Sequence, residues 1–296
     1  HVYLWRSKVV NVLSGILTSQ TSLKILDLNI LHTTHINQER LASIVSGLKC
    51  LHNLTHLALR MGLPDISTDT VHSFYRIIGG LSKLQTLVIH FDKLGHIVMQ
   101  TLPKLYAQIK NLLNLENLGL EIGWNSVQIN SNIFFEAIQG LPHLKKLHVT
   151  LEDDPSGKPD KVAINLEEKL KSLTILEELK FDLRCLRLMP MKGASFMRGF
   201  SCMASLKRLS IRFITFARNE NGTSEDVIKG IEQLENLEAL DIDFRQGKEA
   251  SQTGFRRLVQ KLTSFSKLHT LSISLEEGDA VDEDLVQFAE ALTKIG

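Results

Sequence analysis

Two pairs of histidines are the residues of this sequence that come nearest to a chemical site. His32 and His35, and His52 and His56, have spacings that could hold a divalent metal ion. His52 and His56 flank Leu54, however, where a turn enters a predicted strand, so their rings do not share one helix face. No cysteine or paired carboxylate completes a tetrahedral ligand set with either pair. We therefore predict no metal site and no cofactor.

The common catalytic motifs are missing as well. The sequence contains no Gly-x-Ser-x-Gly motif and no phosphate-binding glycine loop. It also contains no Cys and His within a recognisable catalytic motif. Cys185 and Cys202 are better explained as small apolar residues than as nucleophiles. We therefore predict that the protein is not an enzyme.

Composition narrows the class of partner. The 296 residues are 43% hydrophobic and 23% charged, with a net charge of +1, which is ordinary for a globular protein. A general nucleic-acid or anionic-membrane binder would carry a clear basic excess, and no apolar run approaches the length of a membrane span. We expect protein partners, without nucleic-acid binding or membrane insertion.

The cysteines suggest a compartment. Cys50, Cys185 and Cys202 are few, odd in number and widely spaced, which argues against a disulfide framework. The start of the sequence has no initiating Met and does not resemble a signal peptide. We predict an intracellular, reducing location, most simply the cytoplasm.

A repeated frame of eight residues must position every side chain of interest. Residues 144–151 follow the pattern L-x-x-L-x-φ-x-φ, where φ is apolar, and apolar residues at every second position predict a strand with one buried face. Ten, six and three residues before Leu84 stand Phe74, Ile78 and Leu81, a spacing that marks one face of a helix. The first leucine of the frame recurs every 29 to 32 residues, at Leu23, Leu54, Leu84, Leu115, Leu144, Leu176, Leu206, Leu237 and Leu268.

This pattern resembles the leucine-rich repeat family over nearly the full length of the chain. The long repeat with a full helix looks most like the ribonuclease-inhibitor-like subclass, in irregular versions such as those of protist proteins. Members often carry Asn or Cys eight residues after the first leucine; no copy here does, so we expect no asparagine ladder. The resemblance implies one α/β solenoid domain over residues 1–296, a horseshoe of about nine to ten repeats of ~31 residues. Its parallel sheet would line the concave face and its helices the convex face.

The end of the sequence suggests a fragment. A last helix is predicted from Asp282 to Thr293, and Phe288, Leu292 and Ile295 have the spacing of a helix that precedes another leucine frame. No such frame follows before Gly296. We expect a chain that is cut within a further repeat.

The solvent-facing strand positions are the candidate binding residues, because solenoids bind macromolecules through such extended surfaces. Charge is densest, with both signs interleaved, from Lys146 to Asp243. Two interpretations stay open: charges that satisfy one another across strands, or a protein-binding patch of mixed charge. The candidates are Lys146, His148, Lys180, Asp182, Arg208, Arg212, Asp241 and Asp243.

The function predicted from these features is a non-enzymatic protein–protein interaction module, a scaffold or recognition subunit of a larger protein or assembly. The resemblance leaves alternatives: a regulator of an enzyme such as a GTPase-activating protein, the repeat region of a multidomain kinase, or a substrate receptor of a ubiquitin ligase. The partner is not identified by the sequence, and either the concave or the convex face could bind it.

Overall fold

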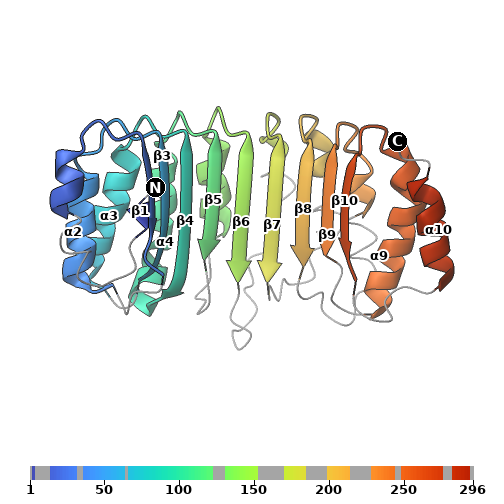
Figure 1. Cartoon of the computed structure of the whole chain (residues 1–296), viewed down its shortest axis with the longest axis horizontal. Coiled ribbons are helices and arrows are strands. Elements are labelled where there is room, and N and C mark those ends of the chain that lie inside the picture. Colours follow the sequence, from blue (N-terminus) through green and yellow to red (C-terminus); the bar gives the residue numbers. More distant parts are fainter. Residues whose placement is uncertain are drawn as a thin grey trace. The chain divides into compact units, whose positions relative to one another are not determined.

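The computed structural model describes residues 2–3, 14–31, 36–63, 66–122, 131–152, 170–184, 199–213, 228–243, 248–275 and 282–293 (Figure 1). His32, His35 and Cys185 lie outside these ranges. The chain divides into two compact units: unit 1 comprises His1–Leu144 and Glu152–Asp154, and unit 2 comprises Lys145–Leu151 and Pro155–Gly296.

Unit 1 is built from parallel strands that follow one another in chain order. Its strands are β1 (Val2–Tyr3), β2 (Ile25–Asn29), β3 (His56–Leu63), β4 (Thr86–Leu94) and β5 (Asn117–Ile122). Its helices are α2 (Gln38–Leu48), α3 (Thr68–Gly80), α4 (His96–Ile109) and α5 (Ser131–Gln139). Successive helices pack against one another, α2 on α3, α3 on α4 and α4 on α5.

The register of unit 1 aligns equivalent positions of the repeated frame. Leu26, Leu57, Leu87 and Leu118 lie side by side across β2 to β5, and none is more than 2% exposed. A slip of one residue would turn every one of these side chains to the other face. The predicted strand positions are therefore confirmed here, and the burial of the leucines fixes the register.

The helices of unit 1 pack as their apolar spacing predicts. Asn37 caps α2 by accepting a hydrogen bond from the Arg40 N–H, at 3.0 Å. Phe74 and Ile78 of α3 are fully buried, and the Phe74 ring packs against Phe91 of β4 with centroids 6.5 Å apart. The helices thus cover the leucine-bearing face of the strands and leave the other face of each strand open.

Unit 2 has the same kind of structure. Its strands are β6 (Lys146–Glu152), β7 (Glu178–Arg184), β8 (Arg208–Phe213), β9 (Ala239–Asp243) and β10 (Thr270–Ser274), again in chain order. Among its described residues, the helices include α9 (Lys248–Lys261), α10 (Asp282–Leu292) and a helical turn over 228–231, with the 3₁₀ turns η1 (Phe200–Cys202) and η2 (Leu262–Ser264). Strands β7 to β10 pair in parallel without a register shift.

A repeated backbone arrangement joins each turn to the next at the start of the strands. In unit 1 the N–H groups of Gln85 and Thr86 both donate to the Thr55 carbonyl, at 2.8 and 3.0 Å. Unit 2 repeats this arrangement at the Glu177 carbonyl, which accepts two N–H groups at 2.9 and 3.0 Å. These bonds fix the register of each strand at its first residue.

Asparagines reinforce this end of the strands, just before the first leucine of the frame and away from the position eight residues after it. Asn53, Asn114 and Asn236 donate through Nδ2 to the carbonyls of Thr21, Ser82 and Ala204, at 3.1, 2.8 and 2.7 Å. The amides thus satisfy backbone carbonyls of the preceding turns.

The α/β class and the parallel, half-buried strands are confirmed, and the predicted last helix corresponds to α10. The single domain over residues 1–296, the number of repeats and their curvature stay predictions. Cys50 and Cys202 are free cysteines. No helix in the described part of the chain is long and apolar enough to span a bilayer.

Candidate protein-binding face

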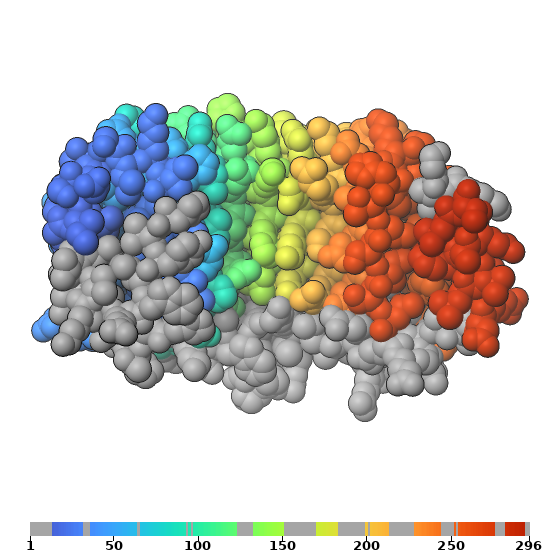
Figure 2. All heavy atoms as spheres, viewed as in Figure 1, coloured from blue at the N-terminus to red at the C-terminus, as the bar shows by residue number. Residues whose placement is uncertain are grey.

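The eight residues predicted from the sequence all lie on one face of the strands of unit 2. Successive side chains of a strand point to opposite faces, so residues two apart share a face. The space-filling view shows the side chains of β6 to β9 as adjacent columns on the face toward the reader (Figure 2). The predicted residues come in pairs: Lys146 and His148 from β6, Lys180 and Asp182 from β7, Arg208 and Arg212 from β8, and Asp241 and Asp243 from β9.

Residues at the same frame position lie side by side across the strands and are here called a row. The first row, which begins with Lys146 of β6, contains a shared ion pair. The Glu178 Oε2 atom lies 3.4 Å from Lys146 Nζ and 3.2 Å from Arg208 Nε. All three side chains are between 38% and 49% exposed, so water screens the pairs and their contribution to stability is small. Two cations gather around one carboxylate, which leaves this row with an excess positive charge.

The middle row holds polar side chains with fewer charges. Ser210 donates to Asp241 Oδ2 at 2.8 Å, and the His148 Nε2 and Thr150 Oγ1 atoms lie 3.4 Å apart. Lys180 is exposed, and within the described ranges its ammonium has no hydrogen-bond or ion-pair partner. Among the described residues, this charge therefore contributes no contact that stabilises the fold.

The third row is an arginine held between two carboxylates. Arg212 lies beside Asp182 on one strand and Asp243 on the other, with Nη1–Oδ2 and Nε–Oδ2 distances of 3.4 and 3.0 Å. The side chains of Asp182 and Asp243 are only 6% and 8% exposed. A buried carboxylate without a cation would cost several kcal/mol or take up a proton, so this row serves the fold.

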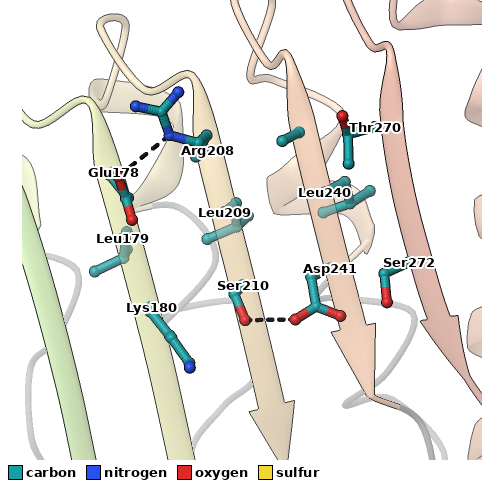
Figure 3. A pocket seen from close by; sticks show the side chains of 11 residues that line it. Glu178, Leu179, Lys180, Arg208, Leu209, Ser210, Leu240, Asp241, Thr270 and Ser272 are labelled. Atoms are coloured by element: carbon teal, nitrogen blue, oxygen red, sulfur yellow. Dashed lines mark hydrogen bonds and ion pairs between the residues drawn. The ribbon is translucent and has the colours of Figure 1, made fainter.

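Between the first two rows the face is hollowed. An open hollow of about 190 Å³ is lined by residues of β7 to β10 (Figure 3). Ala239 stands in register between Arg208 and Thr270, and its single methyl group leaves the space that its longer neighbours would fill. The other lining residues are Glu178, Leu179, Lys180, Leu209, Ser210, Leu240, Asp241 and Ser272.

The structure thus brings the eight predicted residues onto one face but divides them by role. Asp182 and Asp243 are nearly buried on either side of a half-exposed Arg212, whereas Lys146, Lys180 and Arg208 are exposed. The charges do pair across strands; whether they also bind a partner stays a prediction.

Two lining residues that we did not single out, Glu178 and Ala239, shape the face. Glu178 has the same frame position as Lys146 and Arg208, and opposite charge at matching positions of adjacent repeats could have revealed the pairing. Ala239 is the one small residue of its row in unit 2, where the others are Lys146, Glu178, Arg208 and Thr270. A size comparison along the row could have located the hollow.

The open face of unit 1 is paired in a similar manner but carries less charge. Arg60 donates to Asp27 at 2.7 Å, and His90 Nδ1 contacts a carboxylate oxygen of Glu121. The amide of Asn117 donates to Thr86 at 3.0 Å. Valine, alanine and glycine occupy the positions between these pairs in β3 to β5.

Groups with displaced pKa values lie away from both faces. In unit 1, burial raises the pKa of Tyr75 to about 12 and also raises the pKa of Tyr106. In unit 2, the hydrogen bond to Asp284 raises the pKa of Arg256. Among the residues that the structure describes, no three His, Cys, Asp or Glu side chains cluster as a metal site.

No protein-family model matches the sequence, and no curated protein is significantly similar to it.

Proposed function

We propose that the chain is a leucine-rich repeat protein that acts as a non-enzymatic protein–protein interaction module. In this proposal its repeats form a curved solenoid, with the strands on the concave face and the helices on the convex face. Support comes from the recurring leucine frame, the parallel strands in chain order and the repeated turn bonds. Two free cysteines fit a reducing, intracellular location.

The observation that carries the function is the open strand face of unit 2. A broad face with exposed cations, a hollow and a polar rim has the mixed character of transient protein interfaces. Arginine is enriched at the energetic centres of such interfaces, and Arg208 is half exposed beside the hollow. We propose that the partner docks on this face.

Within the face, Lys146, Lys180 and Arg208 are the residues we assign to binding. Each is exposed, so a partner can reach its charge without disrupting the core. Arg212, Asp182 and Asp243 would act indirectly, by holding β7, β8 and β9 in place.

The test is site-specific photo-crosslinking with a benzophenone amino acid in extracts of the native source. One variant carries the probe at Ser272, an exposed residue of the open face, and the matched control carries it at Lys261 of α9, also exposed. A discrete partner crosslinked at Ser272 and absent at Lys261 is expected. Purified partner should then bind a Lys180→Glu variant more weakly than wild type or Lys261→Glu. Crosslinks that form only at Lys261 would contradict binding through the strand face.

A further inference from the structure

We propose that the open face of unit 2 binds an acidic protein segment in extended conformation. One acidic side chain would dock on Lys180, another on Arg208, and a small apolar side chain next to the second would fill the hollow at Ala239. This inference rests on the proposed function and adds the chemistry of the partner.

The hollow has the size of a side chain rather than of a cofactor. Sites for small molecules usually measure about 300–1,000 Å³, whereas this hollow measures about 190 Å³ and is open to solvent. Its lining includes the methyl group of Ala239 on the open face, and it reaches Leu179, Leu209 and Leu240, whose side chains belong to the core and are at most 2% exposed. An apolar side chain presented from above would bury its surface there.

Donor groups of Arg208 and Lys180, which both line the hollow, have no partner among the residues that the structure describes. Arg208 contacts Glu178 through Nε at 3.2 Å, and in the described part of the chain its two terminal Nη groups have no partner. Figure 3 shows these outer nitrogens turned away from Glu178, and the Lys180 ammonium extended the other way along β7. A guanidinium fork binds a carboxylate through two parallel hydrogen bonds, and Glu178 already holds the arginine in place for it.

Lys180, Arg208 and Ala239 lie on the neighbouring strands β7, β8 and β9, with Arg208 in register between Glu178 and Ala239. Alternate residues of an extended segment lie on one face, about 7 Å from each other. A segment that crosses the strands with the pattern acid-x-acid-x-apolar would therefore meet Lys180, Arg208 and the hollow in turn.

Charge also argues against a nucleic acid as the occupant. The cations Lys146, Lys180 and Arg208 lie on β6 to β8, whereas the next strand along presents the carboxylate of Asp241 at the hollow. A phosphate chain that continued across the strands would meet this carboxylate. The net charge of the whole sequence is only +1, without the basic excess of nucleic-acid binders.

The experiment selects random twelve-residue peptides, displayed on phage, against the full 296-residue chain. Selected peptides are expected to share two acidic residues at alternate positions and an apolar residue at the next alternate position. Replacing both acids by their amides should weaken binding at least about tenfold. The variant with Lys180→Gln and Arg208→Gln should lose binding to the same extent, while Lys261→Gln should not.

Asp241→Asn serves as a second control, because it removes the carboxylate beside the hollow and keeps the side-chain volume. It should bind the selected peptides as tightly as wild type or more tightly. Thermal unfolding of every variant verifies that the fold persists.

Several results would overturn the inference: no selected peptides, peptides without acidic enrichment, equal binding by the Lys180→Gln and Arg208→Gln variant, or stronger competition by single-stranded RNA than by the peptides. The crosslinking experiment separates the two proposals. Crosslinks at Ser272 to a partner segment that lacks acidic residues would overturn the inference alone, whereas crosslinks only at Lys261 would overturn the proposed function.

Discussion

At the scale of single residues, Arg212 shows how similar charges on one face can have different roles. It lies between the nearly buried carboxylates of Asp182 and Asp243, whereas Arg208 pairs with the exposed Glu178. From the sequence both arginines qualify as binding residues. Reversing the charge of Arg212 would place three carboxylates together and damage the fold. Of the two arginines, Arg208 is therefore the one suited to a charge-reversal test.

We predict that Arg212→Ala destabilises the protein by about 1–3 kcal/mol, because it removes the cation from two carboxylates that have little access to water. Arg208→Ala should cost less than about 1 kcal/mol, since its ion pair is exposed. Urea unfolding of both variants measures the difference. An Arg212→Ala variant as stable as Arg208→Ala would show that Asp182 and Asp243 do not depend on the guanidinium.

Tyr75 makes the stability of unit 1 sensitive to alkaline pH. Burial raises its pKa from 10.0 to about 12 in the folded protein. Between these two values the unfolded chain releases the proton while the folded chain keeps it, so stability is retained below pH 10 and falls as the pH rises. The loss should approach about 1.4 kcal/mol per pH unit for this tyrosine. Urea unfolding at about pH 9, 10 and 11 measures the slope, which follows from the linkage relation.

Tyr75→Phe is the matched control for this effect. It keeps the ring packed in the core and removes the titrating hydroxyl, so stability should fall less steeply above pH 10 than in wild type. Identical slopes for the two proteins would show that Tyr75 does not titrate differently in the folded and unfolded states.

At the scale of elements, the attachment of α10 depends on a few contacts with α9. Arg256 donates to the buried Asp284 through Nε at 2.9 Å and Nη2 at 3.1 Å, and Phe255 packs edge-on against Phe288. The exposed face of α10 includes Leu285, 45% accessible. The helix therefore gains little from burial and depends on this pair.

We predict that Arg256→Ala loosens α10 more than Asp284→Ala does. The first variant leaves a buried carboxylate without its cation, whereas the second leaves an arginine that water can solvate. Hydrogen exchange should quicken along 282–292 in the order wild type, Asp284→Ala, Arg256→Ala, with β7 and β8 unchanged. Equal exchange in both variants would contradict a clamp based on the buried charge.

How far the sequence predicts each element depends on how much of the element is apolar. The strands were predictable because leucines such as Leu118 and Leu209 must be buried and recur at a fixed spacing. Helix α3 was predictable from the same logic, since Phe74 and Ile78 have the spacing of one helix face and are buried. The asparagine bonds were not, since Asn53 and Asn236 join a side chain to the carbonyl of another turn, and no local pattern marks such a contact.

The candidate face was predictable only in part, for a similar reason. Alternation along each strand assigns all eight residues to one face. It does not tell which charges are buried, because burial depends on what packs beside each strand end. Asp182 and Asp241 have equivalent chemistry in the sequence, yet the first is nearly buried and the second borders the hollow.

At the scale of the whole molecule, we predict three free thiols. Cys50 and Cys202 are free in the structure, and Cys185 is expected to be free from its place in the sequence. Titration with a thiol reagent under denaturing, non-reducing conditions should detect all three. Detection of a single thiol would mean an internal disulfide and would contradict a reducing location.

The repeated turn bonds have a consequence for how such a gene can change. The Thr55 and Glu177 carbonyls each accept an equivalent pair of N–H groups, and the main contacts of each element are with the next one. One turn can therefore take the structural place of another. Loss of residues 54–83 by unequal recombination would join Asn53 to Leu84 and bring Ile25 opposite Thr86, both in frame. Stability in such arrays is roughly a sum over neighbours. Recombination can therefore lengthen or shorten this protein by whole repeats. Natural variants should differ in length by about 31 residues or a multiple of that number.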